Sequence, residues 1–375
     1  MPRIFLHIGA SKTGTTYVQG VLFDNRDELA ARGVRYPGHY AEAHYEAVQD
    51  LRGISIGGRE DESLHGRWRS LVDEARRWSG DTVVISHELL GGSTDEAAGR
   101  AVASFEGADL HVVLTARDLG RQVPAMWQEY VKNHGTLPFD AYVRRIAREP
   151  RRSRAAQLFW RQQHVAEIAE RWCRHVPAER FHLVTVPPAG AAPDLLWQRF
   201  ASVVGIEPTG LVSERDRSNT SLSYAEAELL RRINRSLGER LDWLAYERTV
   251  KHQFAEDVLA TGGRDGRPSV PVIHRPWFQQ QHRDMVGSLR ALGVDVVGDL
   301  DDLEPSFGGP DTVDGPDLEE VVTAATAALA ELLSQRADRF ARGRGKQLAA
   351  RARRSGVVRA LPDGIQQWLK RRVTD

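Results

Sequence analysis

The sequence predicts a three-layer α/β/α fold with a central parallel sheet, followed by a helical C-terminal extension. Short, continuous apolar runs alternate with helical segments in the N-terminal half, and a glycine-rich turn follows the first run directly. Strands that helices cover on both faces read as continuous apolar runs rather than as alternating ones. In open sheets of this kind ligands bind beyond the C-terminal strand ends. We therefore expect the chemistry just after residues 8, 86, 116 and 186.

The period of the apolar residues predicts each element in turn. A strand at 4–9 (IFLHIG) leads into a helix at 15–31, which Gly33 ends. The elements that follow are helices at 41–52 and 64–79, a strand at 82–86, a helix at 95–105, a strand at 110–116, helices at 119–134 and 139–148, a polar break at 149–154, a helix at 157–175, a strand at 181–186 and a helix at 195–204. Beyond residue 205 the pattern becomes less regular, with helices at 223–237 and 240–260, a Gly- and Pro-rich loop at 261–276, and a helix at 317–340.

Composition and charge exclude several classes of protein. The 375 residues carry 51 basic and 51 acidic side chains, and this net charge of zero argues against nucleic acid as the partner. The single Cys173 rules out an intramolecular disulfide. With no signal peptide predicted, it indicates a reducing, cytoplasmic compartment. No apolar run approaches the ~18 residues that a membrane span needs.

The zero net charge hides two uneven segments and one compositional bias. Residues 299–320 carry nine acidic and no basic residues, which predicts an exposed loop. Residues 341–375 carry ten Arg or Lys against two Asp. Such a tail is typical of a solvated terminal helix and leaves peripheral contact with an anionic membrane open. Only five of the 51 basic residues are lysine, and Lys12 is the only lysine among the first 131 residues.

The segment 9–16 (GASKTGTT) stands between the first strand and the first helix. Its glycines allow backbone N–H groups to turn inward, and the helix N-terminus adds a partial positive charge, so we predict a phosphate site. The Walker A pattern is incomplete, because Gly9 and Gly14 have the right spacing but Thr15 replaces the lysine. The lysine stands earlier, at Lys12. The expected fold is therefore P-loop-like, without the Mg²⁺-centred nucleoside triphosphate chemistry of that motif.

The loop K-T-G-T-T after a first strand resembles the 5′-phosphosulfate loop of sulfotransferases that use 3′-phosphoadenosine 5′-phosphosulfate (PAPS). The resemblance implies that Lys12 stabilises charge on the leaving phosphate, without a metal, and that 3′-phosphoadenosine 5′-phosphate (PAP) is the product. A compact ammonium suits a single bridging oxygen better than a planar guanidinium does. The residues that the resemblance places around the donor's phosphosulfate are Ser11, Lys12, Thr13, Gly14, Thr15 and Thr16.

The third strand ends at Arg117, where the same family has an arginine that binds the 3′-phosphate of PAPS. A serine eight residues later normally shares this phosphate, but Ala125 occupies that position here. The groups that could complete the site instead are Arg121, Gln122 and the segment 215–219, which contains Arg217. The runs at 127–133 (WQEYVKN) and 159–163 (FWRQQ) are also similar to bacterial members of this family, many with unassigned acceptors. The resemblance covers roughly residues 1–210.

A proton acceptor is expected after the second strand, at His87 or Glu88. The acceptor alcohol or amine must lose a proton as it attacks sulfur, and either side chain could take it. Neighbouring side chains of an extended segment point to opposite sides, so only one of the two is expected to face the donor. Glu88 is the preferred candidate and His87 the second.

The resemblance implies an enzyme that transfers sulfonate to a hydroxyl or amine of a small-molecule, lipid or carbohydrate acceptor. The acceptor pocket is expected from the variable segments 38–62 and 250–280, with Trp127 and Trp160 as possible wall residues. We divide the chain into a sulfotransferase-like α/β domain with helical acceptor-side segments at 1–298, and an acidic loop, helix and basic tail at 299–375.

Two other functions stay open at this point. A P-loop kinase of small molecules would use ATP and Mg²⁺, but the lysine of its motif is displaced and no clear acidic strand end serves the metal. A non-catalytic nucleotide-binding relative would fit the alanine at position 125. Metal sites are not predicted, because the run HELLG at 87–91 lacks the second histidine of H-E-x-x-H.

Overall fold

The computed structural model describes residues 2–53, 62–148, 152–213, 221–261, 266–308 and 315–354, with the backbone alone for 341–354. The predicted segment 215–219, including Arg217, lies outside the described residues, as do residues 149–151 of the polar break at 149–154.

Six parallel strands form one sheet in the order β2-β3-β1-β4-β5-β6, which confirms the predicted fold class. The strands are β1 (Arg3–His7), β2 (Val34–Arg35), β3 (Thr82–Ser86), β4 (Asp109–Ala116), β5 (Phe181–Thr185) and β6 (Asp295–Val297). The chain builds the sheet first on one side of β1 and then on the other. This reversal makes the loops after β1, β3 and β4 diverge, which is where α/β proteins bind ligands.

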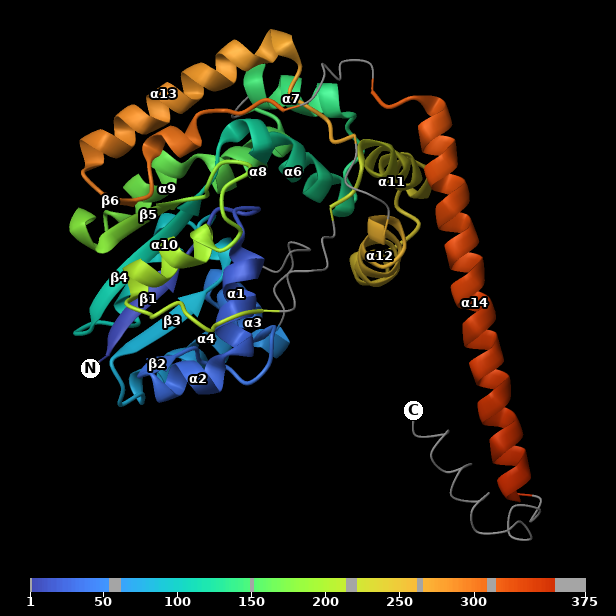
Figure 1. Cartoon of the computed structure of the whole chain (residues 1–375), viewed down its shortest axis with the longest axis horizontal. Coiled ribbons are helices and arrows are strands. Elements are labelled where there is room, and N and C mark those ends of the chain that lie inside the picture. The colour runs from blue at the N-terminus through green and yellow to red at the C-terminus, as the bar shows by residue number, and fades with distance from the viewer. Residues whose placement is uncertain are drawn as a thin grey trace.

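Helices cover both faces of the sheet, as Figure 1 shows. Alternate residues of β1 serve the two cores: Phe5 packs with α1 and α10, and Ile4 and Leu6 pack on the opposite face. The helices are α1 (Thr15–Asp24), α2 (Arg26–Ala31), α3 (Ala43–Arg52), α4 (Arg67–Arg76), α5 (Asp95–Ala103), α6 (Leu119–Lys132), α7 (Phe139–Arg148), α8 (Arg154–Gln163), α9 (Val165–Trp172), α10 (Leu195–Val204), α11 (Tyr224–Leu237), α12 (Trp243–Tyr246), α13 (Arg275–Leu292) and α14 (Leu318–Arg354).

Two predicted helices are each divided into two. The helix predicted at 15–31 breaks at Asn25, whose side-chain amide and backbone N–H both donate to the Val21 carbonyl at the end of α1. The helix predicted at 157–175 breaks at His164, whose Nδ1 accepts from the Glu167 N–H and so caps α9. The apolar period runs through both breaks, so it could not reveal them.

The region beyond residue 237 differs most from prediction. Only α12 is α-helical in the predicted helix at 240–260, and Glu247–Glu256 forms a π-helical segment, η5. Wide helices of this type are rare and occur mostly at functional sites. The predicted loop at 261–276 runs into α13, which begins at Arg275. Sequence analysis predicted neither α13 nor β6. Few residues of α13 are buried, so its apolar pattern is weak.

The acidic segment 299–320 is not simply an exposed loop. Residues Leu300–Leu303 form a short 3₁₀ helix, η8, and Asp302 accepts hydrogen bonds from Arg199 at 2.6 Å and Thr185 at 2.7 Å. These contacts attach the segment to the end of β5. The division of the chain after residue 298 remains a prediction.

Replacing Gly120 by alanine is expected to lower the free energy of unfolding by about 1–3 kcal/mol, because a Cβ there would lie 2.7 Å from the Ser306 carbonyl carbon. Urea denaturation measures the change. Gly287→Ala on α13 is the control, since nothing lies within 4 Å of its added Cβ, and it should be neutral or stabilising. Equal stability of the two variants would show that the acidic segment does not dock on α6.

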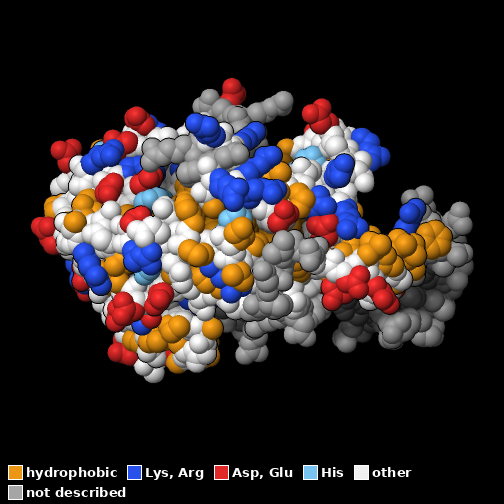
Figure 2. Space-filling model, turned by 90° about the horizontal axis from the view of Figure 1, so that it is seen from above, with side chains coloured by type: hydrophobic (Ala, Val, Ile, Leu, Met, Phe, Trp, Pro, Cys, Tyr) orange, Lys and Arg blue, Asp and Glu red, His pale blue; other side chains and the backbone are white. Residues whose placement is uncertain are grey.

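The last helix, α14, packs on α11 and extends beyond the α/β body (Figure 1). Its exposed apolar residues include Leu318, Val322, Leu329, Leu333 and Phe340. Figure 2 shows orange side chains along the arm at its right. Acidic and basic side chains are both scattered over the face in that view. Within the described ranges, no helix combines the length and the apolar character that crossing a bilayer requires.

Candidate functional site

A cavity of about 730 Å³ opens at the C-terminal ends of β1, β3 and β4. Residues just after each of these strands line it, as predicted, whereas those after β5 do not. Its basic lining residues are Lys12, Arg117, Arg121, Lys251 and Arg267. Its acidic lining residues are Glu42, Glu88, Glu129 and Glu247. The cavity lining thus carries five basic and four acidic side chains, a local arrangement that a sum over the whole chain cannot register.

The glycine loop has the backbone shape that an anion site needs. Lys12 and Gly14 both adopt left-handed conformations, with φ of 66° and 83°. For a lysine this conformation is strained, and strain of this kind is concentrated at functional sites. Within the described part of the chain no side chain caps α1, and the N-terminus of a helix carries a partial positive charge that favours an anion. The side chains or backbone of Ser11, Lys12, Gly14, Thr15 and Thr16 line the cavity.

Thr13 is turned into the fold instead. Its hydroxyl donates to the Ala10 carbonyl at 2.5 Å and lies 2.7 Å from the Thr115 hydroxyl. His7 continues this chain, with Nε2 3.2 Å from Thr115 Oγ1 and Nδ1 2.7 Å from Ser86 Oγ. Burial lowers the pKa of His7 to about 4, so the ring is neutral. The buried chain ties the glycine loop to three adjacent strands.

Two glutamines hold the loop from the other side. The Ser11 carbonyl accepts from Gln122 Nε2 at 2.8 Å and from Gln163 Nε2 at 3.0 Å. Gln122 is fully buried and does not line the cavity, so it positions the loop rather than facing a ligand. Gln163 belongs to the run FWRQQ that sequence analysis singled out.

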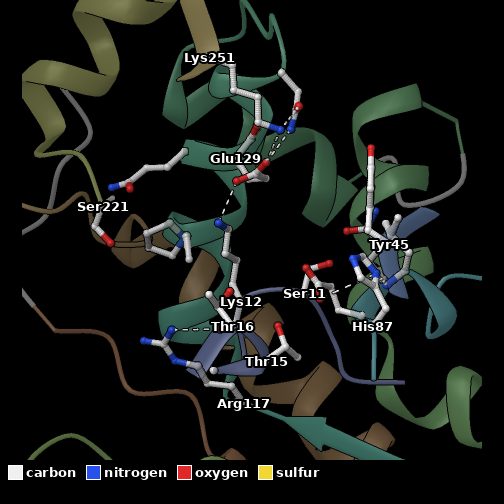
Figure 3. Close-up of a pocket in the computed structure, with 18 of the residues that line it drawn as sticks. Ser11, Lys12, Thr15, Thr16, Tyr45, His87, Arg117, Glu129, Ser221 and Lys251 are labelled. Atoms are coloured by element: carbon white, nitrogen blue, oxygen red, sulfur yellow. Dashed lines mark hydrogen bonds and ion pairs between the residues drawn. The ribbon is translucent and has the colours of Figure 1, made fainter. Parts of the chain in front are cut away.

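Lys12 reaches from the loop to Glu129 on α6, with 2.8 Å between Nζ and Oε2 (Figure 3). The other oxygen of Glu129 lies 3.5 Å from Nζ of Lys251, which donates to Asn133 Oδ1 at 3.0 Å. Glu129 raises the pKa of Lys12 against the effect of burial. Burial alone would raise the pKa of Glu129, but Lys12 and then Lys251 hold it well below its usual range. Lys12 and Glu129 are therefore both charged.

Arg117 lies below Lys12 in Figure 3 and donates to the Lys12 carbonyl at 3.4 Å through Nη1. Its Nε is buried and has no hydrogen-bond partner among the described residues. Burial, and next the charge of Arg121, lower the pKa of Arg117 to about 10. A cation that is both desolvated and incompletely paired is suited to bind an anion.

The position of Ala125 faces the same cavity, so the departure from the family pattern falls in the site itself. Arg121 is held by Asp118 and donates to the Pro187 carbonyl at 3.0 Å. Ser221 and Arg267, which sequence analysis did not name, also line the cavity. Ser221 directly follows segment 214–220, which lies outside the described residues.

His87 and Glu88 both line the cavity, and the expectation that only one of them faces the donor stays a prediction. His87 keeps extended backbone, but Glu88–Leu90 form a 3₁₀ turn, which His87 caps by accepting from the Leu89 N–H. Glu88 Oε2 accepts from Gln19 at 3.2 Å. Burial lowers the pKa of His87. Burial alone would raise the pKa of Glu88, but His87 and hydrogen bonds lower it. Glu88 is thus ionised at neutral pH, and His87 is neutral.

Both variable segments named from the sequence contribute to the wall. Glu42 and Tyr45 come from 38–62, and Lys251, His252 and Arg267 come from 250–280. Figure 3 shows Tyr45 and His87 on the side of Lys12 opposite Arg117 and Ser221. Two halves of the cavity therefore meet at the lysine.

The two tryptophans considered for the acceptor wall lie elsewhere. Trp127 is fully buried in the core, and Trp160 lines a second cavity beside α9. Across the described ranges, no group of three or more His, Cys, Asp or Glu side chains is arranged to hold a metal ion.

Glu129 and Lys251 are the main functional candidates that sequence analysis missed. One signal was available, since Lys251 is one of only five lysines and the run WQEYVKN contains Glu129. Their proximity to Lys12 could not be read from the chain, because more than a hundred positions separate each of them from the loop.

The fold and site together define an α/β protein whose glycine loop and several cations line one cavity at the C-terminal ends of the strands. A scan against protein families finds no match, and a search of curated proteins also finds none. A search of solved structures finds a sulfotransferase from Alicyclobacillus acidocaldarius. It is similar over 66% of this chain and 99% of its own, at 14% identity and a TM-score of 0.40.

Proposed function

We propose that the protein is a sulfotransferase that moves the sulfonate of PAPS to a hydroxyl or amine of a small-molecule, lipid or carbohydrate acceptor. The acceptor oxygen or nitrogen attacks sulfur, the bond from sulfur to the bridging oxygen breaks, and its electron pair leaves with PAP. The acceptor's proton passes to a base on the protein. The observation that carries this proposal is the position of Lys12, in the strained turn of a glycine loop with its ammonium in the cavity.

Two different sets of groups on the protein would bind the two ends of the donor. The uncapped start of α1 and the loop from Ser11 to Thr16 would take the 5′-phosphosulfate. Arg117 would take the 3′-phosphate, with Arg267 and Ser221 in place of the missing serine. The ammonium of Lys12 lies between, where negative charge develops on the leaving phosphate. This arrangement does not require a metal, because the lysine supplies the positive charge.

Calorimetric titration with PAP tests the proposal. We expect one PAP per chain to bind in EDTA, since backbone amides, Lys12 and Arg117 supply the contacts. ATP with Mg²⁺, titrated separately, is the comparison. Tight binding of ATP–Mg²⁺ with no binding of PAP would overturn the proposal and support the kinase. A screen of cell extract with labelled donor would then identify acceptors, and labelling of any of them would exclude a non-catalytic relative.

The pH dependence of transfer should identify the base. A base must be deprotonated to act, so activity is lost as the pH falls through its pKa. If Glu88 is the base, as we propose, activity should stay level down to pH 5, because its pKa is below the ordinary 4.5. If His87 is the base, activity should fall at a pH below its ordinary pKa of 6.5.

The matching variants are Glu88→Gln and His87→Asn. Glu88→Gln should reduce turnover by about 10²–10⁴-fold, the usual contribution of a positioned base. A larger loss in His87→Asn, together with an acid limb above pH 5 in the unmodified enzyme, would reassign the role to the histidine.

A further inference from the structure

Three of the chain's five lysines come together around Glu129, in a protein that otherwise uses arginine. Lys12 comes from the glycine loop, Lys251 from η5 and Lys132 from the end of α6. Lys12 and Lys251 each contact one carboxylate oxygen of Glu129. Lys132 is buried and adds its charge nearby, and burial together with the charge of Lys12 lowers its pKa to about 8.

A carboxylate at this place needs an explanation, because the proposed donor is itself strongly anionic. Glu129 lines the same cavity as Arg117 and the glycine loop. Without a counter-ion it would repel the donor and weaken its binding. Its contact with Lys12 also occupies the ammonium that the leaving phosphate needs. A carboxylate paired with Lys12 alone would therefore weaken donor binding in two ways, by repelling the donor and by occupying the Lys12 ammonium.

We propose that Glu129 and Lys251 are positioning residues for Lys12, an inference that rests on the proposed function. Glu129 holds the ammonium of Lys12 above the glycine loop while the site is empty. When the donor's phosphosulfate draws Lys12 away, Lys251 remains on the other carboxylate oxygen and neutralises it. The exchange replaces one ion pair of Lys12 by another and leaves no carboxylate unpaired beside the donor.

The surroundings of Lys251 suit this role. Its side chain is only 12% exposed, and Asn133 fixes its ammonium at 3.0 Å, so it stays in place when Lys12 moves. The π-helical geometry of η5 brings Lys251 and His252 to the cavity wall. Lys251 therefore connects η5 to the part of the cavity that contains Glu129 and Lys12. Figure 3 shows Lys251 above Glu129.

A double-mutant cycle with PAP binding as the readout tests the inference. Lys251→Met should weaken PAP binding about tenfold, because Glu129 then faces the ligand's phosphates without its second cation, and only the uncharged Asn133 amide still donates to Oε1, at 2.8 Å. Glu129→Gln should bind PAP as tightly as the unmodified protein or a few-fold more tightly. In the double variant, PAP affinity should return to within about twofold of the unmodified value, which a merely structural role of the two residues would not produce.

The outcomes separate this inference from the proposed function. If the unmodified protein does not bind PAP, the proposed function fails and this inference with it. If it binds PAP but Lys251→Met binds equally well, or the double variant is as weak as Lys251→Met, only this inference is overturned. Lys251→Gln repeats the cycle should the methionine variant fold poorly. Glu331→Gln, an exposed change on α14, is the matched control and should leave affinity unchanged.

Discussion

Replacing Lys12 by methionine is expected to reduce sulfonate transfer by about 10²–10³-fold while PAP binding weakens by about tenfold or less. The ammonium acts on charge that develops on the bridging oxygen during transfer, whereas the loop amides and Arg117 hold the bound nucleotide. The loss should therefore fall on turnover rather than on nucleotide affinity. Transfer of labelled sulfonate and calorimetry with PAP measure the two effects separately.

Lys12→Arg controls for charge at the same position. Its planar guanidinium does not place a compact charge on one oxygen, so we expect it to remain slow although the cation is kept. Circular dichroism should show both variants folded, because the side chain of Lys12 is 38% exposed and is not part of the core. Unchanged turnover in Lys12→Met would refute the role of Lys12 and the proposed chemistry.

Replacing Arg117 by methionine is expected to weaken PAP binding by about 30-fold or more, since truncating one partner of a desolvated, charged contact costs roughly 2 kcal/mol or more. The buried Nε without a protein partner is the structural reason. The specific prediction is a difference between ligands: 5′-AMP, which lacks the 3′-phosphate, should bind the variant and the unmodified protein alike. Titrations with both nucleotides measure it.

Arg290→Met on the exposed side of α13 is the matched control for removal of an arginine, and PAP affinity should not change in it. If Arg117→Met weakened PAP and 5′-AMP equally, Arg117 would contact the part of the ligand that the two share. The 3′-phosphate would then belong to other cations of the cavity, Arg267 among them.

Four strands of the sheet were predictable because each is a continuous run of apolar residues in the sequence. Thr82–Ser86 agrees with prediction to the residue, and β1, β4 and β5 agree to within two. Each is apolar because helices cover both of its faces. β2 and β6 could not be found in this way, since they are edge strands of two and three residues, in which only Val34 is buried. The breaks at Asn25 and His164 depend on single side-chain hydrogen bonds that the apolar period does not register.

The candidate site divides in the same manner. The glycine loop and Arg117 were identifiable because each directly follows a strand, and parallel strands end at one edge of a sheet. The inward turn of Thr13 and the role of Gln122 could not be identified from the sequence. Thr13 has one local hydrogen bond, to Ala10, but its contact with Thr115 and the contact of Gln122 with Ser11 join residues about a hundred positions or more apart.

Local order along the chain was thus enough to predict the parallel α/β class and to single out the glycine loop and one lysine as candidates. The partners of that lysine were decided by the folded structure alone. Glu129 and Lys251 reach Lys12 from a helix and a π-helical segment that only packing brings together, and an ion pair depends on distance through space rather than on separation in sequence. The electrostatic balance of the cavity, with basic and acidic groups almost equal in number, is likewise a property of the fold and not of the composition.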